Sequence, residues 1–336
     1  MQVNAIVCEE IAEDIGSVGL QQIELPDPGP GQVRVRLKAC AVNFPDLLMI
    51  QGKYQFKPPL PFAPGGEAAG DIEACGPGVS FKEGDAVIVG MRYGGFAEAV
   101  VVDESQVKPL PKGMSYAKGA SYQTAYLTAY VALKRRGYLE QGETLLVHGA
   151  TGGVGMAAVD LGKHLGAKVI GTGGRDDKLA VVASRGADHV INYTMEDGSL
   201  GGFRDTVKAL TDGRGADVIY DPVGGDVFDE SMRCINWGGR ILSIGFTSGR
   251  WPQAPVNLIL IKQISVIGVR AGEYGRQDPV KGLENAQRLY AMAEAGEIDP
   301  YISHALPLEK AVEAMRLLEQ RQVVGKAVVT MNGYQM

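Results

Sequence analysis

The chain has 336 residues, a net charge of −6 at neutral pH, and 45% hydrophobic and 21% charged residues. This length exceeds what one hydrophobic core usually supports, so we expect two domains. The acidic balance argues against a nucleic-acid partner. The N-terminus lacks signal-peptide features and no apolar run is long enough to span a membrane, so we expect a cytoplasmic protein with no membrane partner. The four cysteines form no CxxC pair and are expected to be reduced.

Short apolar strands divided by turn-forming residues make up the first part of the chain, to about residue 106. They are predicted over residues 32–38, 68–74, 85–89 and 97–102. Glycine and proline clusters such as residues 26–31 separate the strands. Short strands separated by turn-forming residues are typical of an antiparallel, barrel-like domain.

A buried strand runs directly into a glycine-rich turn between Thr144 and Gly155. The strand is continuously apolar, and apolar residues then recur at the spacing of a helix with one buried face. Such a turn lets backbone N–H groups at the helix start approach a pyrophosphate. The alternative is a purely structural tight turn. The residues predicted to bind a dinucleotide are Ala150, which replaces the first glycine of the motif, Thr151, Gly152, Gly153 and Val154.

The second strand of this region, residues 167–172, ends at Gly173, Gly174 and Arg175. A chain that prefers NAD usually carries an acidic residue there to bind the ribose 2′-hydroxyl. Glycine instead leaves room for a phosphate, and Arg175 and Lys178 can neutralise it. The pattern therefore predicts NADPH as the cofactor. The alternative is that Arg175 and Lys178 are solvated residues at the start of a surface helix.

Three further strands, over residues 188–191, 217–220 and 240–245, alternate with helical segments near 176–185, 203–211 and 226–235. This alternation predicts a doubly wound parallel sheet of the Rossmann type, with ligands at the carboxyl ends of its strands. Val223, Gly245 and Phe246 follow two of these ends and are candidates for the nicotinamide side of the site, although plain turns are the alternative.

The C-terminal tail contains a predicted helix over residues 307–320 and a final strand over 326–330. A lone terminal strand needs a partner, and we expect it to pair with the first domain. The predicted domains are therefore residues 1–124 together with 298–336, and residues 125–297.

This arrangement resembles the medium-chain dehydrogenase/reductase superfamily, with a GroES-like barrel-type catalytic domain and a Rossmann domain. Zinc alcohol dehydrogenases of that superfamily have a cysteine and a histidine where this chain has Asn43 and Gly66, so no metal site is expected. The segments most similar to its zinc-free quinone oxidoreductase branch are 42–46, 51–54, 58–62, 64–67, 82–85, 221–228 and 325–326.

The resemblance implies which residues form the active site. It places Asn43 in the substrate cleft, as a hydrogen-bond donor to a carbonyl oxygen on which negative charge develops. Asp46 and Tyr54 are the two further catalytic candidates. The alternatives are that Asn43 caps a turn, that Asp46 caps a helix, and that Tyr54 lies at a domain edge. Leu48 stands where some relatives have a tyrosine. The resemblance adds Thr128, Tyr193 and Lys326 to the cofactor-binding residues.

The expected function is transfer of hydride from NADPH to a small-molecule quinone, or to an alkene conjugated to a carbonyl, without a metal. One alternative is reduction of enoyl thioesters, for which Lys53 and Lys57 could bind carrier phosphates. Another is an NADPH-binding protein without significant turnover. The apolar residues 258–261 and 264–269, beside Asn257, resemble the segment that pairs two copies in this branch, so a homodimer is expected.

Overall fold

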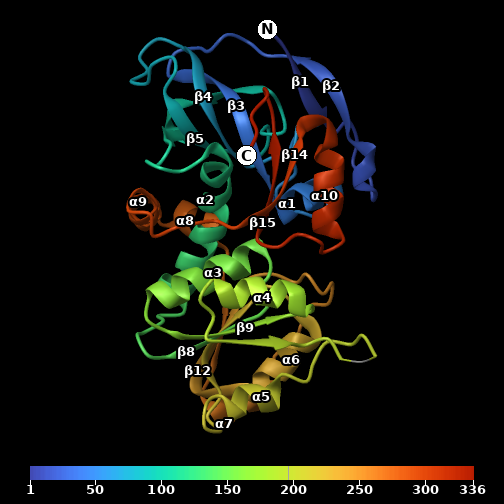
Figure 1. Cartoon of the computed structure of the whole chain (residues 1–336), viewed down its shortest axis with the longest axis vertical. Coiled ribbons are helices and arrows are strands. Elements are labelled where there is room, and N and C mark those ends of the chain that lie inside the picture. Colours follow the sequence, from blue (N-terminus) through green and yellow to red (C-terminus); the bar gives the residue numbers. More distant parts are fainter. Residues whose placement is uncertain (196) are drawn as a thin grey trace. The chain divides into compact units, whose positions relative to one another are not determined.

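The computed structural model describes residues 1–195 and 197–336, which form two compact units (Figure 1). Unit 1 combines Met1–Gln123 with Ala293–Met336, and unit 2 is Thr124–Met292. The boundaries expected from the sequence, at residues 124 and 298, lie close to these. No helix among the described residues is long and apolar enough to cross a membrane.

Unit 1 contains a seven-stranded sheet to which both ends of the chain contribute. Its order is β14 (Ile302–Pro307), β15 (Lys326–Thr330), β3 (Gln32–Val42), β4 (Glu67–Cys75), β5 (Ala86–Gly90) and β7 (Val107–Pro109), and β6 (Ala99–Asp103) pairs with β3. β1 (Gln2–Val7) and β2 (Gly19–Glu24) form a separate antiparallel pair. The last strand, β15, runs antiparallel to β3 with Val328 opposite Ala41, which confirms the pairing expected for the tail.

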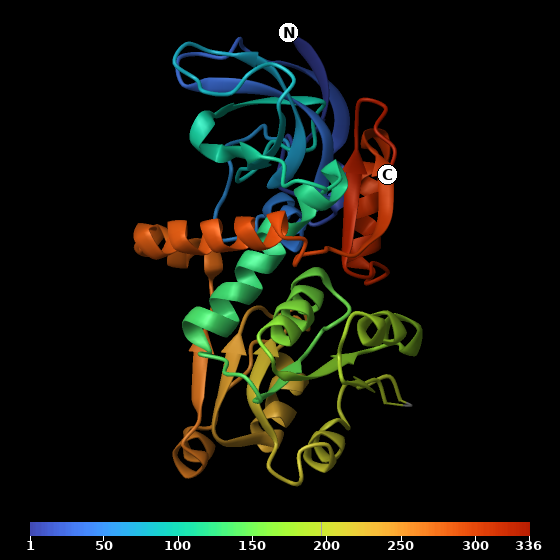
Figure 2. The same cartoon turned by 60° about the vertical axis from the view of Figure 1, so that its left-hand side comes forward.

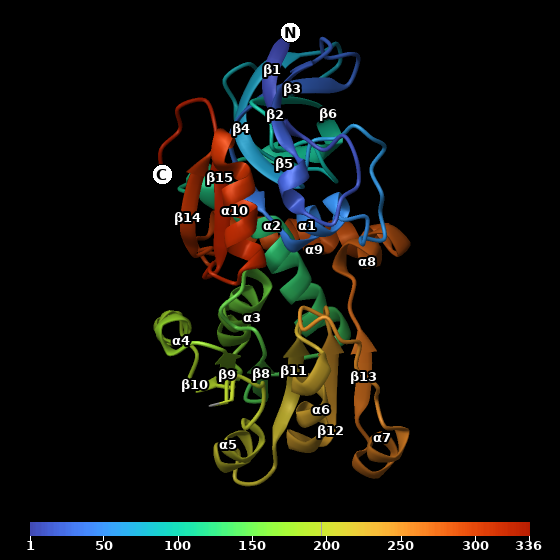
Figure 3. The same ribbon diagram turned by 90° about the vertical axis from the view of Figure 1, so that its right-hand side faces the viewer.

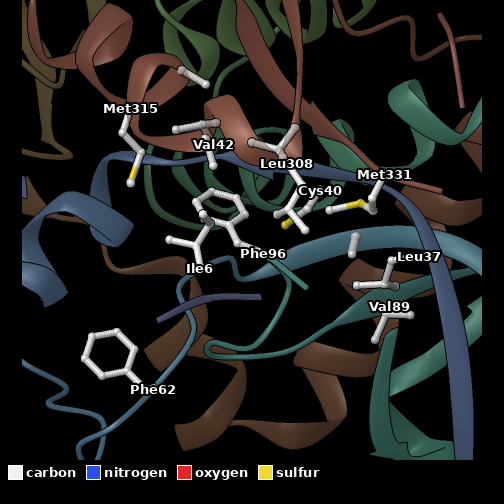
Figure 4. Close-up of a cluster of buried hydrophobic side chains, with 14 of the residues drawn as sticks. Ile6, Leu37, Cys40, Val42, Phe62, Val89, Phe96, Leu308, Met315 and Met331 are labelled. Carbon is white, nitrogen blue, oxygen red and sulfur yellow. The ribbon is translucent and has the colours of Figure 1, made fainter. Parts of the chain in front are cut away.

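The long strand β3 changes from half-buried to fully buried along its length. Val33, Val35 and Leu37 are buried and alternate with the more exposed Arg34 and Arg36, the pattern of a strand with one covered face. From residue 39 to residue 42 every side chain is buried. Figure 4 shows Leu37, Cys40 and Val42 within the hydrophobic core of this unit. Asn43, the residue that follows the strand, therefore lies at the edge of this core.

Three helices accompany this sheet. Two lie within unit 1: α1 (Phe44–Ile50) directly follows β3, and α10 (Ala311–Glu319) packs against β14 and β15 (Figure 3). The third, α2 (Tyr116–Tyr130), begins in unit 1 and continues into unit 2. The helix expected over residues 307–320 is shorter than predicted, because Leu308–Lys310 forms a 3₁₀ turn and α10 begins at Ala311.

Unit 2 is a six-stranded parallel sheet, as expected for a Rossmann domain. Its order is β10 (His189–Asn192), β9 (Lys168–Gly173), β8 (Thr144–Val147), β11 (Ala216–Asp221), β12 (Ile235–Ser243) and β13 (Ser265–Gly268). The direction of winding reverses between β8 and β11, where ligands bind in sheets of this kind. β12 begins five residues before the predicted strand, directly after the preceding helix ends at Cys234.

The helices that connect strands of unit 2 and pack against its sheet are α3 (Gly153–His164), α4 (Asp176–Ser184), α6 (Gly225–Cys234) and α7 (Val256–Lys262) (Figure 2). α5 (Arg204–Ala209) packs against α6, and α8 (Ala271–Gln277) and α9 (Pro279–Glu294) follow the last strand. His148 follows β8 and is completely buried, with Nδ1 2.8 Å from Thr172 Oγ1 and Nε2 2.8 Å from Ser231 Oγ. Burial lowers its pKa to about 3, so it is a neutral core residue.

Asp221, at the end of β11, is a buried carboxyl group that holds the following turn. Its Oδ1 atom accepts hydrogen bonds from the backbone N–H of Val223 at 2.8 Å and of Gly224 at 2.9 Å. Burial nevertheless raises its pKa to about 6, from 3.8 for an ordinary aspartate. The folded state therefore binds this proton more tightly than the unfolded state does. As the pH rises from about 4 to about 6, ionisation of Asp221 reduces the free energy of unfolding, and the reduction persists above that range.

The substitution Asp221→Asn tests this effect, because an amide oxygen can keep both hydrogen bonds and carries no charge. We expect the variant to match the unmodified chain near pH 4. At pH 7.5 we expect it to be more stable by on the order of 2–3 kcal/mol, the free-energy equivalent of the pKa shift. Urea unfolding of both proteins at the two pH values measures the difference. A difference that is equal at both pH values would contradict the raised pKa.

Candidate functional site

The turn after β8 brings the start of α3 very close to the preceding backbone. A Cβ atom on residue 155 would lie 2.2 Å from the carbonyl oxygen of Gly149, so only glycine fits there. Gly149 itself has a φ of +55°, in the region that favours glycine. α3 begins after Gly152, and the first N–H groups of a helix have no acceptor within it. The predicted turn residues therefore do form a helix N-terminus of the kind that binds anions.

The end of β9 lies against this turn. A Cβ atom on Gly173 would be 3.0 Å from Thr151 Cγ2, so the two predicted cofactor segments are neighbours. A Cβ atom on Gly174 would be 3.0 Å from Thr194 Oγ1 and 3.8 Å from Tyr193 Cε2. The structure thus gathers Thr151, both glycines and Tyr193, which the sequence places in three separate segments.

Arg175 and Lys178 lie just beyond these glycines, at the start of α4. Arg175 is exposed and donates to both carboxylate oxygens of Asp177, with Nε to Oδ1 at 3.0 Å and Nη2 to Oδ2 at 2.7 Å. Lys178 is largely buried, and burial together with the nearby Arg175 charge lowers its pKa. Two cationic side chains therefore lie close together at the start of α4. The pairing of Arg175 with Asp177 was not expected, because short-range ion pairs depend on side-chain conformation.

The loops after β11 and β12 are joined to each other and to the glycine turn. The N–H of Thr247 donates to the carbonyl of Pro222 at 3.1 Å. A Cβ atom on Gly149 would lie 3.4 Å from Val223 Cγ2, and one on Gly224 3.0 Å from Phe246 Cδ1. Val223, Gly245 and Phe246 therefore lie around the carboxyl ends of the central strands, where a Rossmann sheet binds its ligand.

Thr128 is a further predicted cofactor residue. It lies on α2, and its hydroxyl donates to the carbonyl of Thr124 one turn earlier, at 2.7 Å. This hydrogen bond lies within the helix and requires no bound ligand. A role for Thr128 in cofactor binding remains a prediction.

In unit 1, Asp46 anchors the backbone around Asn43. One of its carboxylate oxygens accepts the N–H of Asn43 at 2.7 Å and the other accepts the N–H of Gly65 at 3.1 Å. Burial raises the pKa of Asp46 to about 7, although both hydrogen bonds and the charge of Lys326 act in the opposite direction. Asn43, not Asp46, is the residue that precedes α1. Both oxygens of Asp46 have backbone partners, so a catalytic role for it remains a prediction.

The side chain of Asn43 is held by two charged residues that are almost completely buried. Asn43 Nδ2 donates to Glu67 Oε1 at 3.0 Å, and Lys326 Nζ donates to Asn43 Oδ1 at 2.7 Å. Lys326 also forms an ion pair with Glu67 Oε1 at 3.0 Å. Lys326 was expected to bind the cofactor, and a cofactor role remains a prediction. The contacts seen here place its ammonium with Asn43 and Glu67 instead.

Glu67 was not among the predicted site residues. The sequence offered two signals for it: Glu67 lies in segment 64–67, which resembles the quinone oxidoreductase branch, and it is an acidic residue followed by the uncharged residues Ala68, Ala69 and Gly70 at the start of a strand. Only the pairing of β15 with β3 shows that Lys326 is its partner, 259 positions away. A contact across such a sequence distance is set by tertiary structure and has no local pattern.

Tyr54, the third predicted catalytic residue, packs against the hydrophobic core of unit 1 and is partly buried. Nearby in sequence, Phe56 stacks on Tyr93 with ring centroids 6.1 Å apart, and the Arg92 guanidinium lies 4.6 Å from the Phe56 ring centroid. These rings and the arginine pack on one another in a small cluster. The catalytic role of Tyr54 remains a prediction.

The part of the chain that the structure describes contains no group of three or more histidine, cysteine, aspartate or glutamate side chains that could hold a metal ion. Around Asn43 the donor set does not fit a catalytic zinc, which takes about three histidine, cysteine or carboxylate ligands. Asn43 contributes an amide and Gly66 has no side chain. Of the two nearby carboxylates, Glu67 pairs with the ammonium of Lys326, and Asp46 accepts the backbone N–H groups of Asn43 and Gly65.

Comparison with known proteins agrees with this architecture. Residues 29–112 match the family model described as alcohol dehydrogenase GroES-like domain, and residues 153–298 match the one described as zinc-binding dehydrogenase. A quinone oxidoreductase-like protein 2 homolog of Nematostella vectensis is 39% identical over 329 residues, which cover 97% of this chain and 88% of that protein.

Two solved structures of quinone oxidoreductases are also similar. The enzyme of Pseudomonas syringae is 30% identical with a TM-score of 0.86, covering 98% of this chain and 100% of that one. The Escherichia coli enzyme, solved in complex with NADPH, is 28% identical with a TM-score of 0.85, covering 98% of this chain and 99% of that one. From its sequence and its fold, this chain belongs to the quinone oxidoreductase branch of the medium-chain dehydrogenase/reductase superfamily.

Proposed function

We propose that this protein is an NADPH-dependent reductase that transfers hydride to quinones, or to alkenes conjugated to a carbonyl, without a bound metal ion. The observation that carries this proposal is the close approach of α3 to the glycine turn in unit 2, beside the two cations at the end of β9. The complex of NADPH with the similar Escherichia coli quinone oxidoreductase supports it.

The residues of unit 2 fit the two anionic parts of NADPH. We assign the pyrophosphate to the first turn of α3, where Gly153 and Val154 present N–H groups and the helix dipole favours negative charge. We assign the 2′-phosphate to the corner formed by Gly174, Arg175 and Lys178. A phosphate there would offset the mutual repulsion of the two cations.

The substitutions Arg175→Ala and Lys178→Ala test this assignment. Each removes a charge-assisted contact, so we expect the KM for NADPH to rise about tenfold or more, and the KM for NADH to change little. Arg204→Ala is the matched control, because Arg204 is a partly exposed arginine that is also paired with a nearby aspartate, at 3.0 Å, and it lies outside the site. Equal effects on NADPH and NADH would contradict the assignment to the 2′-phosphate.

The chemistry requires an acceptor that is already electrophilic, because no metal polarises its carbonyl. Bound NADPH supplies the hydride. Negative charge then develops on the carbonyl oxygen of the acceptor, and we assign Asn43 Nδ2 as the hydrogen-bond donor that stabilises it. Leu48 cannot supply a proton, so we assign the final protonation of the reduced product to water.

One experiment tests both the reaction and its independence of metal. NADPH oxidation is followed with a panel of quinones, enones, enals and enoyl thioesters, before and after exhaustive chelation. We expect saturable turnover of a quinone or an enone that chelation leaves unchanged. Turnover of enoyl thioesters alone would favour the thioester reductase, and saturable NADPH binding without any turnover would favour a binding protein. Activity that only added zinc restores would contradict the metal-free mechanism.

We further propose that two copies of the chain associate through the edge of unit 2 formed by α7 and β13. β13 is the last strand of its sheet, and an apolar edge strand left unpaired invites association. Beside it, Val256, Leu260 and Ile261 on α7 are between 69% and 76% exposed. Apolar side chains that are this exposed on one short helix indicate a surface that a partner covers.

Sedimentation equilibrium tests the dimer. We expect the mass of two chains for the unmodified protein and for the control Leu20→Glu, which alters an exposed leucine on β2 of unit 1. We expect the double substitution Leu260→Glu and Ile261→Glu to give monomers at micromolar concentration, because it places charge in an apolar interface. A monomeric unmodified protein would contradict the proposal.

A further inference from the structure

We infer that Glu67 and Lys326 are positioning residues that orient the carboxamide of Asn43, so that one of its N–H groups is kept for the acceptor oxygen. This inference rests on the proposed function, in which Asn43 is the hydrogen-bond donor. It adds two residues that contact neither acceptor nor reacting atoms and that act through Asn43.

The fold brings the three residues together at one end of three adjacent strands. Asn43 directly follows β3, Glu67 is the first residue of β4 and Lys326 the first residue of β15, and β3 lies between the other two. In the registers of these strands, Val42 lies opposite Ala327, and Cys40 lies opposite Ala68. The three side chains therefore lie together at one end of three paired strands.

The chemistry of the two charged groups permits one orientation of the amide. An ammonium can only donate hydrogen bonds and a carboxylate can only accept them. As observed, Lys326 Nζ lies 2.7 Å from Asn43 Oδ1, and Glu67 Oε1 lies 3.0 Å from Asn43 Nδ2. Rotating the amide by half a turn would oppose two donors at one end and two acceptors at the other. The ion pair therefore fixes which of the two positions is taken by the amide nitrogen of Asn43 and which by its oxygen.

The arrangement also strengthens the remaining donor. The amide nitrogen carries two hydrogens, and Glu67 accepts one of them. The ammonium on Oδ1 draws electron density from the amide, and hydrogen bonds in a chain polarise one another. Because Lys326 and Glu67 are only 6% and 1% exposed at their side chains, water screens this effect little. The second N–H of Asn43 is consequently both oriented and polarised.

A purely structural role is the competing explanation, since the ion pair also ties β15 to β4 across β3. Buried ion pairs are weak contributors to stability, because desolvating two charges offsets their attraction. A structural role predicts that loss of the pair changes stability and leaves the reaction at Asn43 intact. A role in cofactor binding predicts that loss of Lys326 raises the KM for NADPH. The positioning role predicts that loss of Lys326 lowers kcat, because Asn43 is then no longer oriented.

A double-mutant cycle separates these three explanations. Asn43→Ala alone is expected to lower kcat about 100-fold, the usual effect of removing one oxyanion donor. Lys326→Met alone is expected to lower kcat about tenfold or more, with the KM for NADPH unchanged. In the Asn43→Ala background, Lys326→Met is expected to cause no further loss, because the side chain through which it acts is absent.

Lys326→Met leaves the Glu67 charge buried without its partner and can prevent folding. The paired substitution Lys326→Met with Glu67→Gln removes both charges together, and we expect the same loss of kcat with a melting temperature close to that of the unmodified chain. The matched control is Arg34→Met with Glu73→Gln. That pair joins two strands of the same sheet, β3 and β4, at 2.8 Å and is partly buried, but it does not contact Asn43. We expect the control to leave kcat unchanged.

The outcomes are distinguishable. If Asn43→Ala leaves kcat unchanged, the proposed function of Asn43 is wrong. If Asn43→Ala lowers kcat but Lys326→Met lowers it equally in both backgrounds, Asn43 is the donor and the positioning role of Lys326 is wrong. If Lys326→Met only raises the KM for NADPH, the lysine binds the cofactor as the sequence suggested, and this inference is overturned.

Discussion

The proposed cofactor site depends on one contact between backbone segments, the approach of α3 to the carbonyl oxygen of Gly149. No residue other than glycine fits at position 155, since a Cβ atom there would lie 2.2 Å from that oxygen. The contact presses the first turn of the helix onto the carboxyl end of β8, so its N–H groups face the place where the sheet reverses direction. The neighbouring ends of β9, β11 and β12 then supply the other residues assigned to the cofactor.

In unit 1, strand pairing brings together residues that are far apart in the sequence. Because β15 returns from the far end of the chain to pair with β3, a lysine reaches a buried glutamate and an asparagine 283 positions away. Asn43 and Gly66 stand at the two positions where the resemblance implies zinc ligands in other dehydrogenases. In this chain the side chain of Asn43 contacts the buried ion pair of Lys326 and Glu67.

Much of the fold follows from local sequence patterns. Apolar strands that alternate with helical segments predicted the parallel sheet of unit 2, and short strands between prolines and glycines predicted the different architecture of unit 1. The glycine turn and the glycines after β9 were identified because steric and phosphate-binding demands act within a few residues. The network of Asn43, Glu67 and Lys326 was not predicted, because strand register and side-chain orientation determine it. The pairing of Arg175 with Asp177 and the backbone contacts of Asp46 were missed for the same reason.

Calorimetric titration of the intact protein with NADPH and with NADH tests the central claim most directly. The account predicts one saturable NADPH site per chain, tighter than that for NADH, and at least tenfold weaker NADPH binding in a Gly155→Ala variant that remains folded, because the added Cβ pushes α3 away from the turn. Absence of saturable NADPH binding to the unmodified chain, or unaltered binding in the folded variant, would contradict it.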